Sequence, residues 1–333
     1  MQEIIIQKNE AGQRLDKLLA KYLNEAPKSF LYKMMRKKNI VLNGKKATGD
    51  EKLVIGDSIK LFLADETIEK FSSVNIQRTT KQLDILYEDA DVLLINKPAG
   101  MLAQKAKPSD ESVVEHIISY LLNSKQLEEA QLKSFRPSIC NRLDRNTSGL
   151  ITAGKSLQGL QGLSQYFKER TMGKYYITLV AGEVTQGEHI AGYLYKDCKT
   201  NKVTIASKQT GDASRQDYIE TAYRPLWSTE ELSMLEVHLI TGKTHQIRAH
   251  LAHVGHPIIG DVKYGSTKYN ARYEKQYGVK HQLLHAYRME FPEQEDALTS
   301  LHGKQFVAPL PKIYRTICVE KKGKYGDLEF QRS

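Results

Sequence analysis

Residues 141–150 read NRLDRNTSGL, and this decapeptide places one carboxylate, Asp144, between two guanidinium groups, Arg142 and Arg145. An opposite charge nearby favours the ionised form of a carboxyl group, so we expect Asp144 to remain negative. Such a carboxylate suits a nucleophile better than a proton donor. No second carboxylate lies close in the sequence to complete the acid–base pair of a glycoside hydrolase. Taken alone, the pattern fits a structural ion pair in a tight turn better than a catalytic site.

Two further blocks follow the decapeptide along the chain. Residues 173–182 read GKYYITLVAG, and residues 241–265 read TGKTHQIRAHLAHVGHPIIGDVKYG, with an L-L-H-A segment at 283–286 behind them. Together with R-L-D-x-x-T-S-G-L in the decapeptide, these blocks resemble the motifs of RNA pseudouridine synthases of the RluA/RluC/RluD branch. Three blocks in the right order are far more specific than one short motif. The resemblance spans about residues 83–310.

The resemblance implies three catalytic residues. Asp144 would be the catalytic carboxylate, and Arg248, the arginine of Q-I-R, would keep it ionised and oriented with a planar fork that lysine lacks. Tyr176, the aromatic residue of K-x-Y, would stack on the uracil and could remove the C5 proton. The alternative for Tyr176 is an ordinary core residue of a strand, because Ile177, Leu179 and Val180 are apolar neighbours.

The implied reaction needs only one carboxylate. Conversion of uridine to pseudouridine breaks the bond from ribose C1′ to uracil N1, rotates the base and joins C1′ to C5. Asp144 could attack the anomeric carbon, add to the uracil ring or abstract a ribose proton, and the sequence leaves these routes open. Arg142 would contact the RNA as the uridine flips out, at an unstacking cost of a few kcal/mol. Leu143 is expected to be a packing residue, and neither a metal ion nor an organic cofactor is expected.

Side chains near the implied site and in the first 65 residues are predicted to contact RNA. These predicted RNA-binding residues are Arg142, Arg145, Lys174, His245, Lys28, Lys33, Arg36, Lys37, Lys38 and Lys45.

The chain departs from the family pattern at three positions. Asn141 replaces the usual histidine before R-L-D, Lys243 replaces arginine in T-G-R-T, and Gln104 stands where histidine is frequent. None of these changes removes the implied catalytic residues. They weaken any transfer of substrate identity.

Length and composition agree with an RNA-binding protein of two domains. The 333 residues include 49 Lys and Arg against 39 Asp and Glu, a net charge of +10, which indicates a polyanionic partner unless it serves solubility alone. The three cysteines, Cys140, Cys198 and Cys318, form no C-x-x-C pair, so we expect reduced thiols. No apolar run is long enough to span a bilayer and no leader peptide is recognised, so we expect a cytoplasmic protein without membrane contact.

The first segment has the pattern of a small RNA-binding unit. Apolar residues at helical spacing predict a helix in residues 14–23 and a second one around Phe30, Leu31, Met34 and Met35, and Asn43-Gly44 predicts a hairpin. Residues 28–46 hold seven Lys or Arg and no acid. The order of two helices, a hairpin and a strand after a Gly-Asp turn resembles the S4-like RNA-binding domain. The alternative for the basic run is a solvated helix face.

The remaining pattern predicts an α+β fold. Residues 1–65 are predicted as the S4-like α/β domain, 66–82 as a linker, and 83–325 as the catalytic domain of the pseudouridine synthase fold. Helices are predicted in ESVVEHIISYLLN and after the decapeptide, the latter capped at Gly173. LDILYE at 83–88 and DVLLINK at 91–97 predict a hairpin, and strands dominate the rest, at 175–181, 217–223, 232–240 and 283–291. Because regular βαβ alternation is missing, we expect a mixed, largely antiparallel sheet with flanking helices.

Two other motifs in the sequence would indicate a different function. GLITAGKS at residues 149–156 satisfies the P-loop expression, but a polar segment precedes it and no magnesium-binding aspartate follows, so an NTPase is disfavoured. His245, His250, His253 and His256 crowd one stretch without the H-E-x-x-H spacing, which disfavours a zinc site and favours phosphate or backbone contacts.

The sequence therefore predicts an isomerase that converts specific uridines in RNA to pseudouridine. Ribosomal RNA of the large subunit is the first expected substrate and tRNA the second, and a monomer needs no extra assumption. The competing hypothesis is a noncatalytic RNA-binding or ribosome-assembly protein that keeps the same fold.

Overall fold

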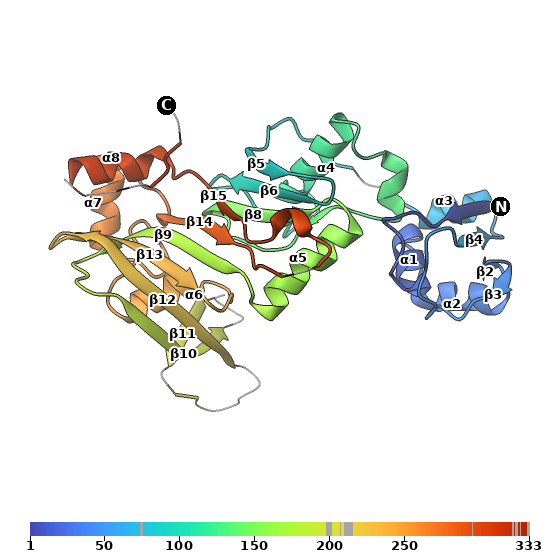
Figure 1. Ribbon diagram of the computed structural model, residues 1–333, viewed down its shortest axis with the longest axis horizontal. Helices are drawn as coiled ribbons and strands as arrows, with labels where there is room; N and C mark the ends of the chain where they lie inside the picture. Colours follow the sequence, from blue (N-terminus) through green and yellow to red (C-terminus); the bar gives the residue numbers. More distant parts are fainter. Residues whose placement is uncertain are drawn as a thin grey trace.

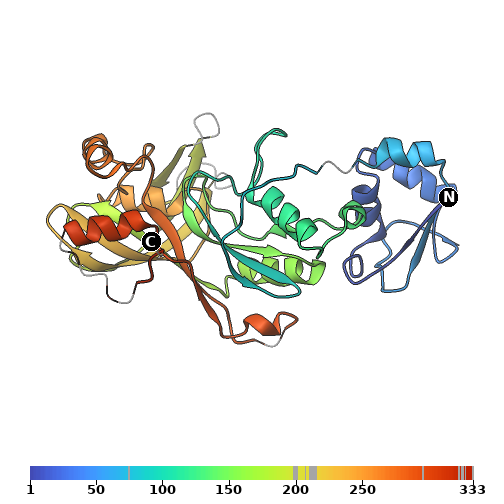
Figure 2. The ribbon, with the colours of Figure 1, turned by 90° about the horizontal axis from the view of Figure 1, so that it is seen from above.

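The computed structural model describes residues 1–73, 76–197, 202–206, 208–209, 216–294, 296–321, 323, 326 and 328–331. It is elongated, with a small N-terminal unit at one end and a large sheet with its helices filling the rest (Figures 1 and 2). Cys198 lies outside the described residues, and Cys140 and Cys318 are free thiols. Within the described residues, no helix is both long and apolar enough to cross a membrane.

The N-terminal unit is a four-stranded antiparallel sheet with three helices. Its elements are β1 (Gln2–Ile5), α1 (Leu15–Tyr22), α2 (Lys28–Arg36), β2 (Ile40–Leu42), β3 (Lys45–Lys46), β4 (Ser58–Leu61) and α3 (Asp65–Phe71), with the strand order β1-β4-β2-β3. Asn43 and Gly44 both have positive φ, 49° and 72°, as the predicted two-residue hairpin requires. The predicted helices and hairpin are thus confirmed.

The segment predicted as a linker begins with a helix instead. α3 buries Ile68 in the N-terminal core, and Phe71 packs on Phe30 with ring centroids 4.8 Å apart. Residues 66–71 of the predicted linker, 66–82, are therefore helical. Two apolar side chains, Ile68 and Phe71, anchor this short helix, and they were too few to give a sustained periodic signal.

The large sheet contains eleven strands among the described residues, in the order β11-β10-β12-β13-β9-β14-β8-β6-β5, with β15 beside β14 and β7 beside β8. The strands are β5 (Ile85–Glu88), β6 (Val92–Lys97), β7 (Ser138–Ile139), β8 (Ser148–Gly154), β9 (Gly173–Ala181), β10 (Glu188–Asp197), β11 (Lys202–Ala206), β12 (Gln216–Ser228), β13 (Leu232–Leu239), β14 (Leu284–Glu290) and β15 (Gln305–Val307). All pairs are antiparallel except β14 with β8. The predicted α+β class with a largely antiparallel sheet is confirmed.

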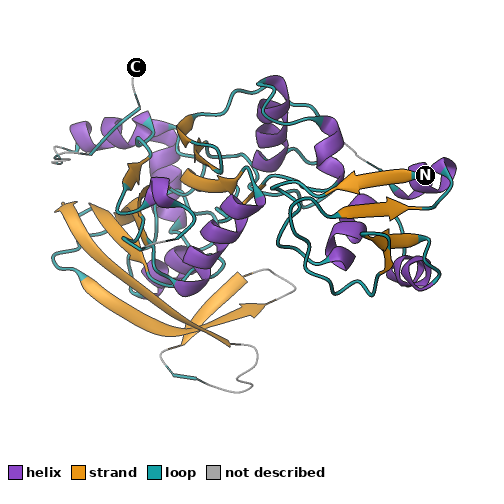
Figure 3. Cartoon of the chain, turned by 45° about the vertical axis from the view of Figure 1, so that its right-hand side comes forward, coloured by secondary structure: helices purple, strands orange, loops and turns teal. Residues whose placement is uncertain are grey.

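Helices cover this sheet, as Figure 3 shows in purple against the orange strands. They are α4 (Val113–Asn123), α5 (Leu157–Glu169), α6 (Gln246–His253), α7 (Thr267–Tyr277) and α8 (Lys312–Glu320), with short 3-10 turns at Glu129–Lys133 and Thr299–Leu301. The predicted cap of α5 at Gly173 is wrong. α5 ends at Arg170, which adopts the left-handed conformation with φ 59°, and Gly173 already begins β9.

Strand β9 is buried on both faces. The alternation of its side chains between these faces determines on which side of the sheet the site forms. Ile177 and Leu179 point into the core beneath α7 and α8, whereas Tyr176 and Val180 belong to the core on the other side. Because side chains alternate along a strand, Lys174 shares the face of Tyr176. This is the face of β9 that the decapeptide approaches.

The two units touch through a few polar contacts. Ser134 donates a hydrogen bond to Glu10 at 2.7 Å, and both side chains are buried. Lys8 lies 3.5 Å from Asp91 at a more exposed point. The N-terminal unit is therefore held against the large sheet by more than chain connectivity.

Candidate active site

Asp144 lies in the loop between β7 and β8. A turn closed by a hydrogen bond from Thr147 N to the carbonyl of Asp144, at 3.0 Å, leads directly into β8. On the other side of Asp144, the amide of Asn141 accepts from Thr152 N at 2.8 Å and donates to the carbonyl of Leu150 at 3.2 Å. The asparagine that departs from the family pattern therefore ties the loop to its own strand.

A buried lysine holds the same loop from behind. The Lys97 ammonium is buried and donates to the carbonyls of Pro98, Met101 and Arg145 at 2.9, 3.0 and 3.1 Å. Burial lowers the pKa of Lys97 to about 7, and the charge of Asp144 acts in the opposite direction. Three carbonyl oxygens match the three donors of an ammonium group, which favours its charged form.

A close contact between two backbones requires glycine at position 149 of the decapeptide. Its φ is +109°, and a Cβ atom there would lie 2.2 Å from the carbonyl oxygen of Ala286 on the parallel neighbour β14. No side chain fits this close approach of two backbones. Gly149 therefore fixes where β8, and with it Asp144, enters the sheet.

Arg248 lies in α6, whose start is fixed by a polar network. The side chain of Gln246 accepts from Thr241 Oγ1 at 2.8 Å and from Lys243 N at 3.0 Å, and donates to the carbonyl of Glu220 at 2.8 Å. His245 precedes the helix in the left-handed conformation, with φ 56°. The buried amide thus locks the T-G-K-T-H-Q loop and the direction in which α6 leaves it.

The guanidinium of Arg248 joins two carboxylates. It binds Asp261 with two hydrogen bonds, from Nε at 2.7 Å and Nη2 at 2.9 Å, and donates from Nη1 to Asp144 Oδ2 at 2.7 Å. Burial alone would lower the pKa of Arg248, but the hydrogen bonds and charges of Asp261 and Asp144 outweigh it and raise that pKa. Arg248 is therefore a permanent cation in a fixed orientation.

Asp261 anchors this pair from the interior. Its side chain has no exposed surface, and its Oδ1 also accepts from the backbone N–H groups of Lys263 and Tyr264 at 2.8 and 3.0 Å. Burial would raise the pKa of Asp261, but Arg248 and the two backbone donors lower it. The Asp144 side chain is 27% exposed, so the chain of charges runs from the interior to the surface of a pocket.

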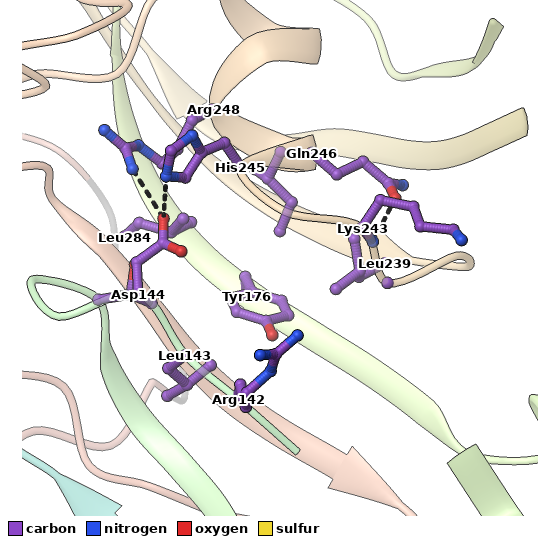
Figure 4. A pocket seen from close by; sticks show the side chains of 13 residues that line it. Arg142, Leu143, Asp144, Tyr176, Leu239, Lys243, His245, Gln246, Arg248 and Leu284 are labelled. Atoms are coloured by element: carbon purple, nitrogen blue, oxygen red, sulfur yellow. Dashed lines mark hydrogen bonds and ion pairs between the residues drawn. The ribbon is translucent and has the colours of Figure 1, made fainter. Parts of the chain in front are cut away.

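The pocket beside Asp144 has a volume of about 90 Å³ and opens into a groove of about 700 Å³ that shares Asp144, Tyr176 and Arg142. Figure 4 shows Asp144 Oδ2 on Arg248, with the second carboxylate oxygen turned toward Tyr176. Among the described residues, no hydrogen bond reaches that second oxygen. The site therefore presents one fixed and one free oxygen of a single carboxylate.

Tyr176 closes the pocket. It is 7% exposed and belongs to the core, yet its ring also forms part of the pocket wall. Burial, with a smaller contribution from the charge of Asp144, raises the pKa of the Tyr176 phenol. A neutral ring in this position offers a stacking surface rather than a phenolate base.

The expected ion pairs of Asp144 with its sequence neighbours are wrong. Arg145 is exposed and donates from Nε to the carbonyl of Gly100 at 3.1 Å, and Arg142 is exposed at the groove without an ion pair in the described part of the chain. The guanidinium of Arg145 is thus bound to a backbone carbonyl and not to Asp144. The pairing with Arg248, which the resemblance implied, is present at 2.7 Å.

His245 also faces Asp144. Its Nε2 lies 3.8 Å from Asp144 Oδ2, while Nδ1 shares a hydrogen bond of 3.0 Å with the hydroxyl of Tyr264. Burial lowers the pKa of His245, against the opposing charge of Asp144. The imidazole is thus biased toward its neutral form beside the carboxylate.

Apart from Arg145, whose guanidinium binds the carbonyl of Gly100, the predicted RNA-binding residues fall into two groups. Arg142, Lys174 and His245 border the groove at Asp144. The six predicted cations of the N-terminal unit are exposed and make no ion pair within the described residues, namely Lys28, Lys33, Arg36, Lys37, Lys38 and Lys45. Leu143 is 7% exposed in the core, which confirms it as a packing residue.

The competing motifs have structural explanations. Lys155 of the P-loop-like segment pairs with Glu88 at 2.6 Å, and the residues before it form β8 rather than a phosphate loop. His250 Nδ1 shares a hydrogen bond of 2.9 Å with Thr221, and His256 Nδ1 lies 3.4 Å from the carbonyl of Ala181. Within the described residues, no three His, Cys, Asp or Glu side chains come together as a metal site.

Sequence reasoning missed three residues that build this site, namely Asp261, Lys97 and Gln246. Asp261 carried a usable signal, because it lies in the same motif block as Arg248 and is an acid in an otherwise basic or apolar stretch. Lys97 carried little, because a lysine before Pro-Ala-Gly reads as an exposed turn residue.

The sequence of the chain is similar to those of known proteins. Residues 91–253 match the family model for RNA pseudouridylate synthase. The chain is 29% identical over 295 residues to "Ribosomal large subunit pseudouridine synthase C" of Vibrio vulnificus, covering 87% of this chain and 88% of the relative. It is also 29% identical over 294 residues to the protein of that name from Escherichia coli, covering 86% and 88%.

A solved structure shares the fold. "Human RNA Pseudouridylate Synthase Domain Containing 4" superposes with a TM-score of 0.58 and 21% identity, covering 72% of this chain and 92% of the human one. The chain is similar in sequence to the RNA pseudouridylate synthase family. It is therefore an RNA-modifying enzyme of the isomerase class.

Proposed function

We propose that this enzyme converts specific uridines of large-subunit ribosomal RNA to pseudouridine, with Asp144 as the catalytic nucleophile. The observation that carries the proposal is the single carboxylate with one oxygen fixed by Arg248 and the other free beside Tyr176. The choice of ribosomal RNA follows the printed names of the relatives from Vibrio vulnificus and Escherichia coli.

The reaction is an isomerisation that conserves all atoms. The target uridine leaves the RNA stack and enters the pocket, where its base lies on Tyr176. The bond from C1′ to N1 breaks, the uracil rotates, C1′ bonds to C5, and the proton lost from C5 is balanced by one gained at N1. The free oxygen of Asp144 acts on the nucleotide while Arg248 keeps the carboxylate ionised and in place.

The N-terminal unit is proposed to act as an S4-like RNA-binding domain, with its boundary near residue 65 and the segment to residue 82 leading into the catalytic domain. Its exposed, unpaired cations would contact phosphates and add salt-sensitive affinity. Arg142 would contact the RNA at the flipped nucleotide. The protein is proposed to act as a monomer.

The test is pseudouridine formation on defined RNA. Unmodified transcripts of large-subunit ribosomal RNA and of tRNA are incubated with the wild type, Asp144→Asn and Asp65→Asn, and pseudouridines are mapped by chemical adduct and reverse-transcription stops. Asp65 is the matched control because its side chain is 72% exposed in the N-terminal unit. The wild type and Asp65→Asn should modify the ribosomal transcript, whereas Asp144→Asn should not.

Each result bears on one part of the proposal. Modification of tRNA alone would refute the ribosomal substrate. Modification that survives Asp144→Asn would remove Asp144 from its role. RNA binding without modification of any transcript would favour the noncatalytic alternative.

A further inference from the structure

The groove beside the pocket contains an unusual buried cation. Lys174 is 8% exposed and forms part of the groove wall two residues before Tyr176 on the same face of β9. Its ammonium makes no hydrogen bond and no ion pair within the described part of the chain. A Cβ atom added to Gly242 across the groove would lie 4.0 Å from Lys174 Nζ.

Burying an unpaired ammonium is costly, because the group loses water and gains no acceptor. Lys174 makes no ion pair within the described residues, and the carboxylate in the groove wall, Asp144, is already bound by Arg248. The other charged or titratable groups around Lys174 are Arg170 and Lys168 at the end of α5, Lys243 and His245 from the loop before α6, Arg142 from the decapeptide, and His238 from β13. Its neighbour on β14, Met289, is uncharged.

The charge of the groove is strongly one-sided. Its walls contain five Lys or Arg side chains and one carboxylate, Asp144, which is already bound by Arg248. Lys168 and Arg170 are exposed and make no ion pair among the described residues. Among the groove's Lys and Arg side chains, the described part of the chain neutralises only Lys243, through Asp217 at 2.6 Å. An anion is therefore the missing partner of this region.

We propose that Lys174 and Arg170 bind a backbone phosphate of the RNA, at the nucleotide that enters the pocket or its immediate neighbour. The proposal rests on the proposed function, since it assigns a role to the groove that leads to Asp144. Lys174 would supply a buried point charge and Arg170 a forked donor at the rim, and both geometries suit phosphate oxygens. Because Lys174 and Tyr176 are two residues apart on one strand face, about 7 Å, phosphate and base would be gripped together.

The same arrangement predicts a pH dependence of RNA binding. Burial, and secondarily the charge of Arg170, lower the pKa of Lys174 to about 8. A bound phosphate favours the protonated ammonium, so binding takes up a proton near this pH. RNA affinity should therefore fall as pH rises through 8.

The first test measures the salt dependence of binding with full-length protein and a fluorescein-labelled deca-uridylate RNA. Anisotropy gives the binding constant between 50 and 300 mM KCl at pH 7. Arg170→Gln should make the slope of log K against log salt shallower by about 0.7, the value for one phosphate contact on a single strand. The matched control is Arg315→Gln, an exposed and unpaired arginine on α8, which should keep the wild-type slope. A slope for Arg170→Gln equal to that of the control overturns the role of Arg170.

The second test addresses the buried lysine without removing its charge. Lys174→Arg keeps a cation that does not titrate below pH 12, so its affinity for the same RNA should stay flat between pH 6.5 and 8.5 while the wild type weakens. In Arg170→Gln, the midpoint of the pH profile of RNA affinity should lie at higher pH than in the wild type, because the positive charge that lowers the pKa of Lys174 is removed. Thermal melting checks that each variant is folded. Parallel pH profiles of the wild type and Lys174→Arg overturn the role of Lys174.

The two proposals fail separately. If transcripts are modified but the substitutions at Arg170 and Lys174 change neither the salt slope nor the pH profile of RNA binding, the phosphate site is refuted and the proposed isomerase activity is not. If both shifts occur but no transcript is modified, the phosphate site stands and the isomerase is wrong.

Discussion

Arg248 and the six exposed cations of the N-terminal unit carry the same charge but differ in burial and in partners. Arg248 is 8% exposed at its side chain and is fixed by two carboxylates through three hydrogen bonds. The six N-terminal cations are exposed and have no acidic partner within the described residues. The buried cation has one orientation, whereas the exposed ones keep their side-chain freedom.

This difference separates positioning from attraction. A buried guanidinium that is anchored by one carboxylate can hold a second, reacting carboxylate in a fixed place, because burial excludes most of the water that would compete for it. Exposed lysines and arginines release counterions when they meet phosphates, which contributes affinity but little geometry. We therefore expect substitutions in the first region to change stability and rate, and those in the second to change salt-dependent binding.

The largest contrast is expected between Asp261→Asn and Asp217→Asn. Asp261 is a buried partner of Arg248, and loss of its charge should lower the free energy of unfolding by about 3 to 5 kcal/mol. Asp217 pairs with Lys243 at the surface, where both side chains are at least 38% exposed, and its loss should cost less than about 1 kcal/mol. Urea denaturation measures both, and equal losses would refute the distinction.

A smaller effect, confined to binding, is expected from the N-terminal cations. The triple variant Lys33→Gln, Arg36→Gln, Lys37→Gln should flatten the salt slope for ribosomal RNA binding by about 2 and leave the single-turnover rate at saturation unchanged. The matched control removes three exposed, unpaired cations from α7 and α8, at the opposite end of the molecule (Figure 1), namely Lys275, Lys312 and Arg315. If both triple variants change the slope equally, the N-terminal surface has no special role.

The smallest expected difference between the two regions is their stability at acidic pH. Residues 1–73 contain no histidine, whereas burial lowers the pKa of His250, on the helix of Arg248, to about 4. Between pH 6.5 and 4 the unfolded chain binds a proton at His250 that the folded state does not, so stability falls as pH drops through this window. Hydrogen exchange at pH 7 and pH 5 should show α6 losing protection before the N-terminal sheet.

The control for this effect is a pair of histidine substitutions. His250→Gln should reduce the acid sensitivity of α6, while His253→Gln, at an exposed position of the same helix, should reduce it less, because burial is the first cause of the lowered pKa of His250 and the charge of His253 only the second. Equal acid sensitivity in both variants would exclude His250 as its source.

The sequence predicted the elements with strong local patterns. The N-terminal helices, the Asn43-Gly44 hairpin and strands β9, β12, β13 and β14 follow from spacing and turn residues that act over a few positions. Helix α3 and the end of α5 at Arg170 could not be read, because tertiary packing on Phe30 and a left-handed non-glycine residue decide them.

The site was predictable only in part. The order of the three motifs predicted Asp144, Tyr176 and Arg248 as site residues, and all three line one pocket in the structure. The partner of Asp144 could not be found from its neighbours, because Asp144 pairs with the distant Arg248, whereas the nearby Arg145 binds the carbonyl of Gly100. Asp261 and Lys97 act through contacts with residues that are distant in sequence or through backbone carbonyls, which local charge patterns do not record.

The most direct test of the central claim compares rate and affinity for Asp144→Asn on the transcript that the wild type modifies. Under single-turnover conditions with protein in excess, the account predicts a loss of about 10⁴-fold or more in the rate of pseudouridine formation. The dissociation constant for the same RNA should stay within about twofold, because the amide occupies the same volume and the cations of the groove are unchanged. A rate within tenfold of the wild type would contradict the account.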